Sequence, residues 1–236
     1  MRRSNSAVRA RRNESAAGLT VTLVVLAALG LAALGYVGFV LWPRWPAPTR
    51  AMDAPSLPIK VGGVIFNVPP AAIRTAAQRS AGAQPRLDLV FQWPDLSPPQ
   101  PGAKPPLSDD LKPNQLFITI TGPQGTLPLS ERIRTIYPRY TSDAAFTGPA
   151  GLAGVSFRDG TPYQGEDLFF DPENAERFAA RCTRPSGPMA GTCLLERHVG
   201  EAEVTVRFLR EWLPDWRALV ENTDRLLARL KAPVAN

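Results

Sequence analysis

Residues 201–231 read EAEVTVRFLREWLPDWRALVENTDRLLARLK, and inside this stretch the spacing of the apolar residues changes. Val204, Val206 and Phe208 alternate with polar residues, which is typical of a strand that buries one face. From residue 211 onward the apolar residues recur at helical spacing, so we expect a helix with one buried stripe over 211–231. Pro214 suits the first turn of such a helix. The expected stripe comprises Trp212, Trp216, Leu219, Val220, Thr223, Leu226, Leu227 and Leu230.

The chain before this helix is dominated by strand patterns. The segments ERFAARCT, TCLLERHVG and EAEVTVRFLR read as three consecutive antiparallel strands that end at 210, with a turn at Gly200. We expect a hairpin around residues 62–63, further strands at 86–93, 115–122, 151–157 and 166–170, and helices at 71–80 and 127–137. Because helices do not alternate regularly with strands, the pattern predicts an α+β fold. Its mostly antiparallel sheet packs with the C-terminal amphipathic helix.

Residues 94–114 are rich in proline, which sits in neither a helix interior nor a central strand. We therefore expect a long exposed loop. Such a loop is either a docking segment for a partner or a solvated, mobile insertion.

The apolar stretch GLTVTLVVLAALGLAALGYVGFVLW spans residues 18–42 and contains no charged residue. About 20 apolar residues cross the hydrocarbon core of a bilayer as a helix. A cleaved signal peptide has a shorter apolar region that ends in an Ala-x-Ala site, and no good site follows residue 42. We therefore predict a transmembrane signal-anchor helix at 17–42. A linker rich in proline and alanine follows at 43–57.

The arginines on either side of this helix predict its orientation. Residues 1–16 contain five arginines, whereas only Arg44 and Arg50 lie close to the other end. Because arginine excess marks the cytoplasmic side, we expect 1–16 to be a cytoplasmic tail and 58–232 to be a periplasmic domain. The chain would then be a single-pass protein of the inner (cytoplasmic) membrane, in contact with its lipid bilayer.

The positive charge of the chain is concentrated in the tail. Five arginines and one glutamate give the tail a net +4 out of the chain's +6. The exported part also lacks a long basic run with interleaved aromatic residues. We therefore expect no nucleic-acid partner.

The two cysteines, Cys182 and Cys193, are separated by turn-forming residues. Thiols oxidise outside the cytoplasm, so an even number of cysteines predicts a disulfide there. A redox-active pair usually has C-x-x-C spacing, and two sulfurs alone do not complete a zinc site.

Four carboxylates gather at Glu166, Asp167, Asp171 and Glu173. Paired carboxylates can hydrolyse glycosidic bonds and clustered ones can bind calcium, although the spacing of a calcium loop is absent. The plainer interpretation is a solvated face. His198 is the only histidine, and without a partnering nucleophile motif we interpret it as a surface residue of a strand. Neither a phosphate-binding loop nor a dinucleotide fingerprint occurs, so no cofactor is expected.

An anchor, an exported domain and no catalytic constellation together favour a binding or accessory component of a bacterial cell-envelope complex, with a protein partner. One alternative is a periplasmic hydrolase that uses the carboxylates. Another is a transmembrane sensor subunit, although the tail is too short for an output domain. The sequence does not indicate the oligomeric state.

Overall fold

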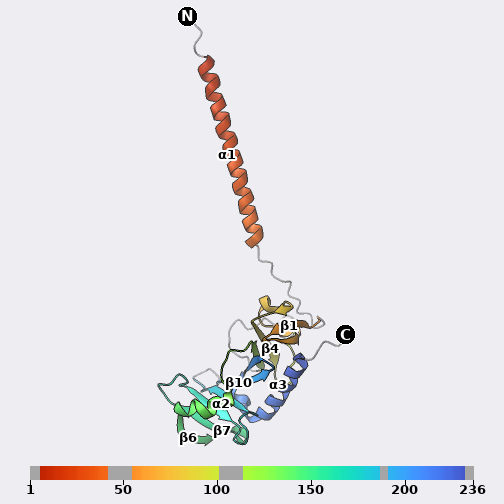
Figure 1. Cartoon of the computed structure of the whole chain (residues 1–236), viewed down its shortest axis with the longest axis vertical. Helices are drawn as coiled ribbons and strands as arrows, with labels where there is room; N and C mark the ends of the chain where they lie inside the picture. Colours follow the sequence, from red (N-terminus) through yellow and green to blue (C-terminus); the bar gives the residue numbers. More distant parts are fainter. Residues whose placement is uncertain (1–5, 42–54, 101–113, 187–190, 232–236) are drawn as a thin grey trace. The chain divides into compact units, whose positions relative to one another are not determined.

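A computed structural model describes residues 6–41, 55–100, 114–186 and 191–231 (Figure 1). The chain divides into two units, Met1–Trp45 and Pro46–Asn236, which we describe separately.

The first unit contains one helix, α1 (Ser6–Leu41). Its segment Val21–Phe39 is long and apolar enough to cross a membrane. The helix begins eleven residues before the predicted start at 17, because the alanines, arginines and glutamate of that stretch are good helix formers. Residues 43–54 of the linker predicted at 43–57 lie outside the described residues.

The second unit is built on a long antiparallel sheet in the order β4-β5-β11-β10-β9-β8-β7-β6. A smaller sheet, β2-β1-β3, includes the predicted hairpin. The α+β prediction is therefore confirmed. The strands are β1 (Leu57–Val61), β2 (Val64–Val68), β3 (Gly82–Ala83), β4 (Arg86–Gln92), β5 (Gln115–Thr121), β6 (Thr141–Thr147), β7 (Ala153–Phe157), β8 (Glu166–Phe170), β9 (Ala179–Thr183), β10 (Thr192–Val199) and β11 (Ala202–Leu209).

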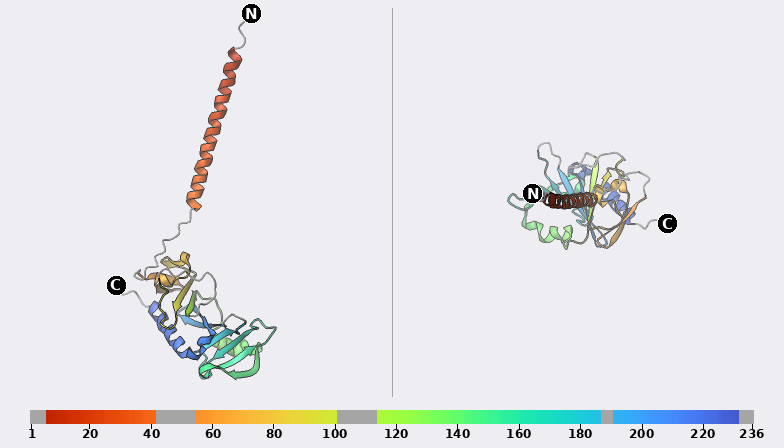
Figure 2. Two further views of the ribbon diagram at one scale, coloured as in Figure 1. Left: turned by 180° about the vertical axis from the view of Figure 1, so that it is seen from behind. Right: turned by 90° about the horizontal axis from the view of Figure 1, so that it is seen from above.

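The predicted C-terminal helix is α3 (Trp216–Lys231), which packs into the main core and contacts β2 (Figures 1 and 2). Six stripe residues are buried along α3, namely Trp216, Leu219, Thr223, Leu226, Leu227 and Leu230. The α-helix begins later than predicted, because residues 210–215, including Pro214, form the 3₁₀ turn η5 (Arg210–Asp215). Trp212 is buried in that turn and stacks on Trp93 with ring centroids 5.2 Å apart.

A second, smaller core lies beneath the short helix α2 (Leu129–Thr135). It includes Leu129, Tyr137, Phe157, Leu168 and Ala179. On β8, Leu168 belongs to this second core whereas the next residue, Phe169, belongs to the main core. Because successive strand side chains point to opposite faces, the long sheet buries apolar residues on both of its faces.

The predicted helix at 71–80 is wrong. The 3₁₀ turns η1 (Pro70–Ala72) and η2 (Ala76–Gln78) occupy this region, and Ile73 forms a bridge with Leu89 of β4. The segment thus runs beside β4, where its backbone bonds to the strand rather than to itself. The amide of Arg74 donates to the carbonyl of Asp88 at 2.9 Å, which a continuous helix would not allow.

Asp88 on β4 is a nearly buried carboxylate. Its carboxylate is bonded by Arg86, by Thr119 Oγ1 at 2.9 Å and by Gln78 Nε2 at 3.1 Å. Burial alone would raise the pKa of Asp88, but these hydrogen bonds outweigh burial and leave its pKa below the ordinary value.

Two further differences concern the segments between strands. Residues 101–113 of the predicted exposed loop lie outside the described part, but Leu96 at its start is buried in the main core. The region 127–137 forms only the short α2, followed by the 3₁₀ turn η3 (Tyr137–Arg139) that contains Pro138. Strand β6 was not predicted, because residues 143–147 are all exposed and so show no apolar alternation.

Candidate binding groove

The four predicted carboxylates do not form one site. Glu166 and Asp167 are adjacent on β8 and therefore point to opposite faces of the sheet. Asp171 and Glu173 follow β8 and both pair with Arg177. Each of the four is thus engaged by an arginine, and none lines the hollows described below.

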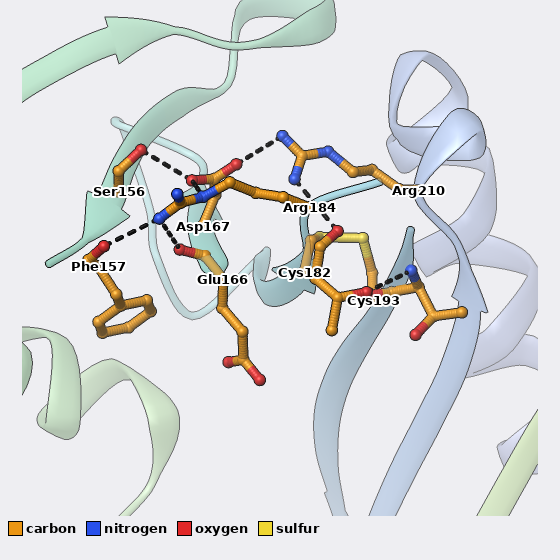
Figure 3. A network of polar contacts seen from close by, with 10 residues as sticks. Ser156, Phe157, Glu166, Asp167, Cys182, Arg184, Cys193 and Arg210 are labelled. Atoms are coloured by element: carbon orange, nitrogen blue, oxygen red, sulfur yellow. Dashed lines mark hydrogen bonds and ion pairs between the residues drawn. A yellow bond between two sulfur atoms is a disulfide. The ribbon is translucent and has the colours of Figure 1, made fainter. Parts of the chain in front are cut away.

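Asp167 is the centre of a buried polar network (Figure 3). Its carboxylate accepts a hydrogen bond from Ser156 Oγ at 2.8 Å and is bonded by Arg184 Nε at 3.1 Å and Arg210 Nη2 at 2.7 Å. Arg184 also donates to the carbonyls of Phe157 and Glu166. Because both of its oxygens are engaged, this carboxylate ties β7 and β8 to the segments that follow β9 and β11.

Glu166 projects to the other side of the sheet, away from this network (Figure 3). It pairs with Arg181 at 2.7 Å, and the Arg181 guanidinium lies over the ring of Tyr163. Burial raises the pKa of Glu166, and the nearby charge of Arg181 only partly opposes this.

Cys182 and Cys193 form a disulfide between directly paired positions of β9 and β10. Beside it, the Thr192 amide donates to Thr183 Oγ1 at 2.9 Å, and Arg210 Nη1 donates to the Thr183 carbonyl at 3.3 Å. The bridge and the Asp167 network therefore share one region of the sheet, as Figure 3 shows.

Within the described residues, no three histidine, cysteine, aspartate or glutamate side chains come together as ligands for a metal ion.

Three hollows adjoin one another at the surface, and two of them lie along α3 while the third extends toward the start of α2. We call them together the α3 groove. Their volumes are about 540, 310 and 460 Å³. The first shares Glu176, Arg197 and His198 with the second, and it shares Arg177, Val220 and Asp224 with the third. The groove is therefore continuous, and it is built from the start of α2, residues 175–177, the end of β10 and α3.

Four apolar residues contribute to the lining of the first hollow, namely Val199, Val220, Leu227 and Ala228. Two arginines cover Trp216 at one end, since the guanidinium of Arg217 lies 4.4 Å and that of Arg177 lies 5.4 Å from its ring centroid. His198 lies at the other side of the groove and is exposed, as expected for a surface residue of a strand.

The rim of the groove carries charges of both signs, and most of them are paired within the chain. Arg197 Nε lies 3.1 Å from Asp224, and Arg225 lies 2.9 Å from Glu221. Two rim cations, Arg217 and Lys231, have no acidic partner among the described residues. Arg217 does donate a hydrogen bond to the carbonyl of Ala150 at 3.1 Å, and it lies over the Trp216 ring. The groove therefore offers apolar side chains between two cations that lack an acidic partner in the described part of the chain.

The groove could not be predicted from the sequence because its walls come from four separate segments. One signal within α3 was available. Residues 217, 220, 224, 228 and 231 are spaced by three or four, which places them in one row along the edge of the buried stripe.

Neither protein-family models nor curated proteins give a match to this chain. Two solved structures are similar. The immunity protein Smlt3025 of the Stenotrophomonas maltophilia type IV secretion system aligns with a TM-score of 0.53 at 17% identity, over 76% of this chain and 94% of its own. The chain shares its fold with this immunity protein. The iron-regulated outer membrane lipoprotein FrpD of Neisseria meningitidis aligns at 12% identity over 81% of this chain and 97% of its own, with a TM-score of 0.46.

Proposed function

We propose that this chain is a single-pass inner-membrane protein whose domain, from residue 58 onward, lies on the periplasmic side and binds a protein of the cell envelope. The apolar segment Val21–Phe39 and the arginine-rich residues before it support the anchor and its orientation. The Cys182–Cys193 disulfide supports an oxidising compartment for the domain. The inner-membrane lipid bilayer is then its second partner.

The α3 groove carries the binding role. The apolar residues Val199, Val220 and Ala228 line it between Arg217 and Lys231, two cations without an acidic partner among the described residues. The chemistry that complements this surface is a protein segment with apolar side chains flanked by carboxylates. The chain with the same fold, Smlt3025, is an immunity protein of a secretion system, and an accessory role in the envelope agrees with that neighbour.

The hydrolase alternative gains no support from the four carboxylates. Both oxygens of Asp167 are engaged by Ser156, Arg184 and Arg210, and Glu166 faces the opposite side of the sheet. The sensor alternative still requires a separate cytoplasmic output protein, and we do not favour it.

Site-specific photo-crosslinking in cells tests the groove. A photo-reactive residue that replaces Val220 in the full-length protein should form an adduct with one envelope protein, through an apolar and acidic segment of it. Lys231→Glu should lower the adduct yield by roughly fivefold, the equivalent of about 1 kcal/mol, because the segment then meets a like charge.

The matched control for the charge is Arg229→Glu. Arg229 is exposed on the same helix but does not line the groove, so its reversal should leave the yield unchanged. The same photo-reactive residue at the exposed Ser80, outside the groove, controls for random contacts. Equal adducts from positions 220 and 80, or equal losses with the two reversed charges, would refute binding through this groove.

A further inference from the structure

The two edges of the long sheet differ in how they are protected. At one edge, β4 is covered by residues 70–80, which bond to the strand through Ile73, Arg74 and Gln78. The other edge is β6, and its residues 143–147 are exposed one after another. Among the strands of the described chain, β6 has the longest unbroken run of exposed residues.

The free backbone groups of β6 can be assigned from its pairing with β7. The Gly148 amide donates to the Leu152 carbonyl at 2.7 Å, and Thr147 pairs with Ala153 and Ala145 with Val155. Residues of an antiparallel pair alternate between bonding to each other and pointing away. The N–H and C=O groups of Ala145 and Thr147 therefore point outward from the sheet.

The sequence of β6 lacks most features that keep edge strands apart. Natural edges are blocked by lysine, proline or a bulge. β6 reads TSDAAFT, without lysine or proline, and its irregularity lies between Thr141 and Ala145, before the free part. Its remaining charge is Asp143.

The exposed aromatic residue of β6 is held in a fixed position. Phe146 contacts the edge of Phe169 with centroids 5.7 Å apart, and it lies over Gly154, where a Cβ atom would come within 2.4 Å of its ring. The residue as a whole is nevertheless 39% exposed. It therefore presents a rigid apolar surface beside the free edge.

We propose that a second copy of this chain pairs with β6 in the antiparallel direction, about a two-fold axis at Ala145. This register places each Ala144 opposite Phe146 of the other copy and each Asp143 opposite Thr147. Small residues then meet large ones, no like charges are opposed, and the outward groups of Ala145 bond to their own equivalents. This self-complementarity selects a second copy as the occupant, and the inference is independent of the α3 groove.

Variants at Ala145 test this pairing in the full-length protein. In detergent, wild type should have twice the 25.6 kDa mass of the chain by light scattering, after subtraction of the detergent. Ala145→Asp places two carboxylates directly opposite each other, so it should weaken the dimer by at least about tenfold. The matched variant Ala145→Asn has the same size without the charge and should remain dimeric. A monomeric wild type, or an undiminished dimer of Ala145→Asp, would overturn the proposal.

A cysteine at the same position reports on the register. Paired residues of this kind have Cα atoms about 5.5 Å apart, which a disulfide can bridge. Oxidation of Ala145→Cys in native membranes should therefore give a covalent homodimer, whereas Ile65→Cys, at another exposed strand position, should not. A covalent link from position 145 to a different protein, or none above the Ile65→Cys control, would also count against the homodimer.

Discussion

Replacing Cys182 and Cys193 together by alanine lowers the melting temperature of the oxidised full-length protein by roughly 6–12 °C. The bridge joins residues eleven apart, and closing a loop of that size stabilises the native state by about 3 kcal/mol in the chain-entropy model. Both cysteines are fully buried, so their removal also leaves space beside β9 and β10. Thermal unfolding followed by tryptophan fluorescence measures the effect.

Reduction of the wild-type protein supplies the control for this prediction. A reduced wild type should melt near the double variant, because both have lost the same cross-link. If the oxidised wild type and the double variant melt together, and free thiols titrate in the wild type, the disulfide does not exist in the purified protein.

Asp167→Ala destabilises the domain by about 3 kcal/mol, because it leaves the charges of Arg184 and Arg210 without their shared carboxylate. The Asp167 side chain is only 5% exposed, whereas the Arg184 side chain is 40% exposed. Solvent therefore screens the charge of Arg184 and lowers the free-energy cost of leaving it unpaired. Chemical unfolding by urea measures the free-energy difference.

Two further variants calibrate this value. Asp167→Asn keeps an acceptor for Ser156 Oγ and should fall between wild type and alanine. Glu221→Ala removes an exposed pair with Arg225 and should change the stability by less than about 0.5 kcal/mol. A loss for Asp167→Ala no larger than that of Glu221→Ala would show that the network does not hold the strands together.

The sequence predicts those elements that bury one regular face. Strand β11 and helix α3 follow from the spacing of Val204, Val206 and Phe208 and of the buried stripe. Strand β6 buries no regular face, because both of its faces are exposed from residue 143 to 147, and the sequence therefore did not predict it. The segment at 71–80 has the composition of a helix, but its backbone groups bond to β4 instead.

Local sequence could not predict the partners of the acidic residues. Glu166 and Asp167 are neighbours in the chain, yet their arginines come from β9, from the segment after β9 and from the turn after β11. Strand alternation separates the two carboxylates by face, and the register of β8 with β9 decides which arginine each one meets. The α3 groove could not be predicted for the same reason, because its walls come from distant segments. Only the row of residues on α3 itself could be recognised in the sequence.

Topology reporters fused after Asn236 of the full-length protein test whether the domain lies on the periplasmic side of the membrane. One reporter should be an enzyme that folds only in the periplasm, and the other a protein that is functional only in the cytoplasm. We expect activity of the periplasmic reporter alone, because the arginines before the apolar segment Val21–Phe39 keep the amino terminus inside. Activity of the cytoplasmic reporter alone would place the domain on the inner side of the membrane and contradict both the proposed orientation and the envelope partner.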